Sequence, residues 1–194
     1  MNTNEDIILK TLEIGHEKGL ANVSILDIAT ATGLRKSSLY SHFKSKDDII
    51  QSMMDHCHDL LAEKTFMVDF KAKDAQSLLV SLIESFIETF AEPPLSHYYA
   101  VVQQQRLYHP SFSTIAHELE SMVTARVKVA LEYCVQRSWL NIPDTDAAGE
   151  LFSCAVQDCL AKLSATPEAA AALGCEDTDW ELNRLVDNLL MLFE

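Results

Sequence analysis

Glycine is scarce in this chain, with five residues among 194, well below the ordinary usage of about 7%. β-Sandwiches and glycine-rich nucleotide-binding loops need glycine at their turns, so the composition argues against both. Leu, Ala and Glu are frequent instead, which favours an all-α chain. Hydrophobic residues make up 48% of the sequence, enough to bury a sizeable core.

Long hydrophobic runs are also absent, because no stretch reaches the roughly 18 apolar residues that a membrane span needs. The first ten residues, MNTNEDIILK, contain no basic segment before an apolar one, so no signal peptide is expected. The five cysteines are an odd number, which predicts free thiols in a reducing compartment. We therefore expect a cytoplasmic protein with no membrane partner.

Basic charge is in short supply, with 15 Lys and Arg against 29 Asp and Glu, a net charge of −14. A uniformly acidic surface would repel nucleic acid. The deficit is uneven, however: residues 1–47 hold six basic and six acidic residues, so the whole −14 falls in residues 48–194. Residues 33–46 hold four basic residues and no acidic one, which leaves this segment suited to approach phosphates.

Turn signals and apolar spacings of three and four predict about nine helices and no convincing strand. Two capping-box spacings, at Ser24–Asp27 and Ser45–Asp48, mark helix starts. We expect two domains, residues 1–47 and residues 48–194. The expected helices cover residues 5–18, 25–31, 36–42, 46–66, 75–91, 96–108, 112–138, 146–164 and 178–193.

Residues 25–43 have the pattern of a helix-turn-helix. Two short helices that cross closely need a small residue at the contact, and Ala29 meets this need. The turn needs a residue that accepts a positive φ, which Gly33 does. Apolar side chains hold the pair on its support: Ile28, Leu34 and Leu39. The second helix then presents small or amphipathic side chains that fit a DNA major groove: Lys36, Ser37, Tyr40 and Ser41.

Residues 8–50 resemble the N-terminal DNA-binding domain of the tetracycline-repressor (TetR) family of transcriptional regulators. The resemblance rests on Gly19, residues 24–29, the pair Thr32-Gly33, residues 36–43 (KSSLYSHF) and residues 44–49. It implies that residues 36–42 form the recognition helix and that Lys46 contacts phosphate at the start of the fourth helix. The complete set of expected DNA contacts is Ser24, Arg35, Lys36, Ser37, Ser38, Tyr40, Ser41, His42 and Lys46.

Three positions depart from the family pattern. Arg35 replaces the usual Ser or Thr cap of the recognition helix, so capping there is in question, although its cation can reach phosphate. Leu26 replaces a polar residue, and we expect it to be exposed or to pack on a second subunit. Gly15 replaces a large apolar residue, which should cost about 1 kcal/mol of helix stability.

Beyond residue 50 the resemblance is architectural, and it implies a helical domain for dimerisation and ligand sensing. The last two helices suit a four-helix dimer interface, although part of each face must belong to the chain's own core. The expected interface residues are Leu151, Cys154, Ala155, Asp158, Leu182, Leu185, Val186 and Leu189. The expected pocket residues, each also explicable as ordinary core, are Phe86, Phe90, Tyr98, Tyr99, Val102, Gln103, Arg106, Tyr108, His117 and Met122.

Arg106 could meet an anionic ligand or pair with a nearby glutamate. Adjacent residues on a helix are about 100° apart, so the run Asp55–His58 does not have the i, i+4 spacing of helical metal ligands. No catalytic grouping is present, and neither a metal nor a cofactor is expected. The leading hypothesis is a ligand-responsive repressor that binds a palindromic operator as a homodimer. The alternative is a DNA-bound scaffold that recruits a protein partner without sensing a small molecule.

Overall fold

The computed structural model describes residues 3–64, 66, 68–164, 184, 186–188, 190 and 191. Within these residues the chain forms α-helices and one short 3-10 helix, and no strand, so the all-α prediction is confirmed. The elements are α1 (Thr3–Lys18), η1 (Leu20–Asn22), α2 (Ile25–Thr32), α3 (Lys36–His42), α4 (Lys46–Ala62), α5 (Ala75–Phe90), α6 (Leu95–Gln105), α7 (Pro110–Gln136) and α8 (Thr145–Leu163).

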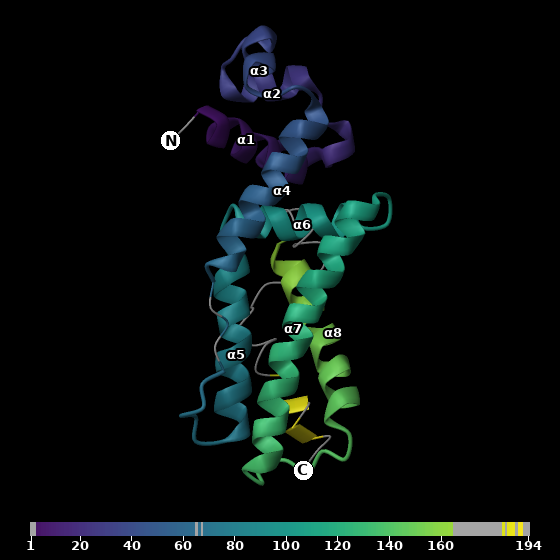
Figure 1. The fold of residues 1–194 in the computed structure, drawn as a ribbon. Helices are drawn as coiled ribbons and strands as arrows, with labels where there is room; N and C mark the ends of the chain where they lie inside the picture. Colours follow the sequence, from purple (N-terminus) through teal and green to yellow (C-terminus); the bar gives the residue numbers. More distant parts are fainter. Residues whose placement is uncertain are drawn as a thin grey trace.

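The helices form a small head and a long body (Figure 1). Helices α1, α2 and α3 make the head, and α4 leaves it towards the body. Helices α5, α7 and α8 run along the length of the body, while α6 lies across them next to the head. Helix α4 packs on α1 in the head and on α6 in the body, and it is continuous across residues 47 and 48. The domain boundary at that point stays a prediction.

Most helix boundaries agree with the sequence pattern, but two expected helices end early. The helix expected over residues 46–66 ends at Ala62, and the one expected over residues 96–108 ends at Gln105. Pro110 is the first residue of α7, and proline is favoured there because its missing N–H has no helical partner to lose. The 3-10 helix η1 was not expected from the sequence. It follows Gly19, whose φ of 82° ends α1 as predicted.

One continuous apolar core joins the head to the body. Helix α5 contributes a fully buried apolar face, which includes Leu78, Leu82 and Phe86. Phe66 stacks on Phe86 with ring centroids 4.9 Å apart, and Phe90 lies 5.2 Å from Tyr99. Among the described residues, no helix is both long enough and apolar enough to cross a membrane.

The described C-terminal residues are helical and pack on the body. Val186 is fully buried, and the Gln76 side-chain amide of α5 donates to Asp187 at 3.2 Å. The helix expected over residues 178–193 therefore agrees with the structure where it is described. Of the residues expected at the dimer interface, three fall outside the described residues: Leu182, Leu185 and Leu189.

Candidate nucleic-acid interface

The first helix of the motif starts at a complete capping box. The Ser24 hydroxyl accepts from the Asp27 backbone N–H at 3.2 Å, and the Asp27 carboxylate accepts from the Ser24 N–H at 2.7 Å. Lys18 pairs with the same carboxylate at 2.8 Å. Hydrogen bonds from Lys18 and Ser24 hold the pKa of Asp27 well below its usual range. The expected capping box is confirmed, and it ties α2 to the end of α1.

The turn of the motif has the predicted geometry. Gly33 ends α2 with a φ of 67°, in the left-handed region that favours glycine. A Cβ at this position would meet no atom within 4 Å, so backbone conformation alone explains the glycine. Ala29 is buried where α2 meets its neighbours, and its carbonyl accepts from the Leu34 N–H at 3.0 Å.

Helix α3 has one buried side chain and one half-buried residue, Ser38, and its other residues are exposed. Leu39 is 1% exposed and packs in the head core. The residues of the expected recognition face are exposed: Lys36, Ser37, Tyr40 and Ser41. Arg35 lies at the N-cap and is also exposed, and its side chain makes no capping bond. Because that guanidinium caps nothing, it is available to a phosphate.

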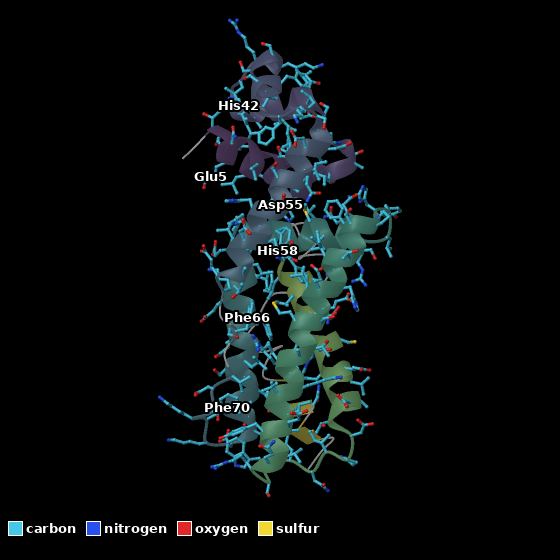
Figure 2. All side chains as sticks on the ribbon, in the orientation of Figure 1. Glu5, His42, Asp55, His58, Phe66 and Phe70 are labelled. Carbon is cyan, nitrogen blue, oxygen red and sulfur yellow. The ribbon has the colours of Figure 1, made fainter. Side chains whose placement is uncertain are left out.

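The end of α3 is tied back to the start of α1. The His42 ring nitrogen Nδ1 lies 2.6 Å from the side-chain oxygen of Asn4, and because a carbonyl oxygen can only accept, Nδ1–H donates. Figure 2 labels His42 in the head, on the side where α1 begins. This contact joins residues 38 positions apart, and no local pattern in the sequence indicates it.

Five residues expected to contact DNA make internal bonds or are partly covered: Ser24, Ser38, Ser41, His42 and Lys46. The Ser41 hydroxyl donates to the Ser38 carbonyl at 2.6 Å. Ser24 takes part in the capping box, and Ser38 is half-buried. The ammonium of Lys46 donates to the carbonyl of Leu20, the first residue of η1, at 3.1 Å. An ammonium has three N–H donors, so this bond leaves Lys46 able to contact phosphate as well. Ser45 caps α4 by accepting from the Asp48 N–H at 3.1 Å, but Asp48 accepts from the Lys44 N–H rather than from Ser45.

The head meets the body at two stacked imidazoles. His16 of α1 and His97 of α6 have ring centroids 4.2 Å apart and planes inclined by 15°. His16 is buried, and its Nε2 donates to the Ser164 carbonyl at the end of α8, at 3.0 Å. Burial and the neighbouring His16 lower the pKa of His97, while Glu13 and Glu17 raise it by less. The junction therefore favours a neutral His97.

We expect the junction to make folding sensitive to acid. Because the pKa of His97 is lower in the folded chain, the unfolded chain takes up the proton first as the pH falls below about 6.5. The free energy of unfolding should therefore decrease from pH 7.5 to pH 5, and the decrease should be smaller in His97→Gln. Urea unfolding at several pH values measures this. His58→Gln, at an exposed position of α4, should keep the full decrease, and an equal effect of both substitutions would contradict the assignment.

The expected pocket residues divide into buried and peripheral groups. Phe86, Phe90, Tyr98, Tyr99 and Val102 are buried in the core. Burial raises the pKa of Tyr99 to about 12. Gln103, Arg106 and Met122 are half-buried, whereas Tyr108 and His117 are exposed. Tyr108 is 81% exposed in the turn between α6 and α7, so it lines no interior pocket, and that expectation is wrong. A pocket among the buried residues stays a prediction.

Arg106 forms an ion pair with Glu120 of α7 and also donates to the side-chain oxygen of Gln103 at 2.8 Å. The sequence left an anionic ligand and a nearby glutamate as alternatives, and in this structure the partner is the glutamate. Arg106 therefore joins α6 to α7. A different contact joins α6 to α8: the Tyr99 hydroxyl donates to the Gln157 carbonyl at 3.3 Å.

One face of α8 is not covered by the rest of the described chain. Leu151 is 73% exposed, and Cys154 and Asp158 are exposed beside it, with Ala155 half-buried. These four expected interface residues share this face. Val186 does not belong to an open face, because it is 0% exposed within the chain's own core. Its assignment to the dimer interface is therefore corrected to the interior of the subunit.

Comparison with known proteins agrees with this architecture. Residues 7–53 match the sequence family described as bacterial regulatory proteins, tetR family. A TetR-family transcriptional regulator, PfmR from Thermus thermophilus, has a TM-score of 0.70 at 19% identity, covering 95% of this chain and 97% of that one. A transcriptional regulator from Rhodococcus sp. Rha1 has a TM-score of 0.68 at 14% identity, with 99% and 98% covered.

A third similar structure is MexZ, a repressor responsible for antibiotic resistance in Pseudomonas aeruginosa. It has a TM-score of 0.67 at 17% identity, covering 97% of this chain and 92% of that one. At these identities the likeness shows the fold, and it extends over nearly the whole chain. The head is matched by sequence and by structure, whereas the body is matched by structure alone.

Proposed function

We propose that this protein is a ligand-responsive repressor, because residues 7–53 match the tetR family of bacterial regulatory proteins and the chain has the fold of TetR-family regulators. In this proposal a homodimer binds a palindromic operator through its two heads. A small molecule bound in the body changes the distance between the heads. The protein acts in the cytoplasm, where the operator DNA is located.

The single observation that carries the proposal is the exposed face of α3. Seven residues are too few to form a stable helix alone, so α3 owes its form to Leu39 and to the turn at Gly33. That support leaves Lys36, Ser37 and Tyr40 exposed on the face that would enter a major groove. The four basic residues within residues 33–46 supply the attraction to phosphate.

The uncovered face of α8 supports the dimer. A leucine that is 73% exposed on a helix otherwise packed into the body is explained if a second subunit covers it. An interface around a two-fold axis places the same face of both subunits in contact. Two heads related by that axis match two half-sites of a palindrome.

The binding test uses the full chain and duplexes from the DNA upstream of its own gene, with fluorescence anisotropy as the readout. We expect tight binding to one palindromic duplex, and much weaker binding to a duplex of the same composition in scrambled order. Folded protein that binds no palindromic duplex even at low salt would contradict DNA binding. Binding to DNA without any response to small molecules would favour the scaffold that recruits a protein partner.

We expect Leu151→Glu to convert the dimer into a monomer, because two buried carboxylates near the axis would repel each other without compensation. The subunit should still fold, because the exposed Leu151 side chain does not belong to the subunit core. Sedimentation equilibrium measures the change, and operator affinity should fall with it. The matched control is Leu107→Glu, at an 81% exposed leucine after α6, which should remain dimeric. A dimeric Leu151→Glu variant would place the interface elsewhere.

A further inference from the structure

A cleft of about 410 Å³ lies between the head and the body. Its head side is formed by η1 and the first half of α4, and its body side by the end of α6 and the start of α7. The size falls within the range of roughly 300–1,000 Å³ that is usual for small-molecule sites. None of the residues expected from the sequence to line a pocket in the body contributes to this cleft.

The cleft has an apolar base. Leu20 from η1, Met54 from α4 and Phe112 from α7 contribute to it and are each 5% exposed or less. Ile50 and Ile115 extend the apolar surface at the sides and are half-buried. An apolar ligand segment would be removed from water on this surface, which stabilises binding in proportion to the area buried.

The polar residues of the cleft favour a negative ligand group. Lys46 and His109 line it, against one carboxylate, that of Asp47. The Lys46 ammonium uses one donor on the Leu20 carbonyl and keeps two others. His109 precedes α7 without capping it, and its ring lies edge-on to Phe112 with centroids 5.6 Å apart. Two nitrogen donors therefore lie beside the apolar base.

We propose that this cleft binds an amphipathic carboxylate, with its apolar part on Met54 and Phe112 and its head group on Lys46 and His109, and that this binding releases DNA. The release rests on the proposed DNA-binding function. Lys46 is where the TetR resemblance implies a phosphate contact. A carboxylate held there occupies the ammonium and adds negative charge near the duplex, so ligand and DNA each lower the affinity for the other.

The binding arm uses isothermal titration of the full chain with decanoate, decanol and decylammonium, all below their micelle-forming concentrations. These probes share one apolar tail and differ in the head group. Decanoate should bind about tenfold or more tightly than decanol, because its hydrogen bond with the Lys46 ammonium is charge-assisted. Lys46→Gln should remove most of that preference. Tightest binding of decylammonium would overturn the proposal, since Asp47 would then dominate the cleft.

Two matched variants locate the ligand. Ser111→Trp places an indole in the cleft from an exposed position in the first turn of α7. Ser113→Trp places the same indole at an exposed position two residues later, which does not line the cleft. Decanoate affinity should fall at least about tenfold in Ser111→Trp and stay unchanged in Ser113→Trp. Equal affinity in the two variants would place decanoate elsewhere and overturn the proposal.

The DNA arm repeats the operator titration with and without saturating decanoate. Decanoate should weaken DNA binding by the wild type and by Ser113→Trp, and leave Ser111→Trp unaffected. Binding of decanoate in the cleft without any change in DNA affinity would overturn the coupling. Failure of all three proteins to bind DNA in the absence of decanoate would contradict the DNA-binding function itself, while the titration with decanoate would still decide whether the cleft is a carboxylate site.

Discussion

Leu39→Ala should destabilise the head and abolish most DNA binding. Leu39 is the one buried side chain of α3 and is 1% exposed. Truncating a buried leucine to alanine costs about 2–5 kcal/mol, because apolar contacts are lost and a cavity remains. Because few other contacts hold this seven-residue helix, the lost free energy destabilises the recognition helix itself. We expect a lower midpoint in thermal unfolding and operator affinity reduced by at least about tenfold, since only molecules with a formed α3 can bind.

The control for this prediction is Leu26→Ala on the neighbouring helix. Leu26 is 68% exposed, so its truncation should change the free energy of unfolding by no more than about 0.5 kcal/mol. Both variants remove the same atoms from the same motif, and they differ in burial. If Leu39→Ala unfolds at the temperature of the wild type, α3 is not held by Leu39, and the physical account of the head is wrong.

The head could be predicted from the sequence because its determinants are local. The capping spacing, the turn glycine and the buried leucine lie within residues 24–39, and each depends on neighbours a few positions away. Gly33 had to accept a positive φ wherever the helices lay in space. The resemblance to one family added the identity of the recognition helix, which periodicity alone cannot supply.

The junction between head and body could not be predicted, because its partners are distant in the chain. His16 meets Ser164 across 148 positions, and within the head, beside the cleft, Lys46 meets the Leu20 carbonyl across 26. Neither pair has a spacing that a local pattern can reveal. The cleft between η1 and α7 depends on both elements, and η1 itself is too short to give a periodic signal.

The helices of the body could be predicted from the sequence, but which of their faces belong to the core, a pocket or an interface could not. Helix α5 is buried on so broad a face that apolar spacing does not distinguish core from pocket. Val186 has the same periodic placement as residues expected at the interface, yet it is buried inside the subunit. The four α8 residues expected at the interface are exposed or half-buried, and that a second subunit covers them stays a prediction. Which part of an apolar helix faces its own chain depends on the neighbouring helices, and the sequence does not order them in space.

Removing the two cations at the start of α3 should cause the largest loss of DNA affinity that leaves the fold intact. Arg35 and Lys36 are exposed, and the Arg35 side chain does not cap the helix, so Arg35→Ala with Lys36→Ala should not change the thermal midpoint. A dimer making about six to ten phosphate contacts loses about 10³–10⁵ in affinity between 50 and 200 mM salt. The double variant removes up to four cations per dimer, and the slope of log affinity against log salt should become shallower by up to about 3.6.

The matched control removes two cations from the other end of the molecule. Lys71 and Lys73 are exposed and follow Phe70, which Figure 2 places at the end of the body away from the head. Lys71→Ala with Lys73→Ala changes the net charge by the same amount, so it should leave the salt slope unchanged if contact with phosphate, and not overall charge, drives binding. Salt titrations of operator affinity measure both variants. Equal slopes for the α3 variant and the wild type would contradict the placement of phosphates at the start of α3. An equal loss of operator affinity in both variants would show that DNA binding depends on the net charge of the whole protein and not on contacts made by residues 33–46.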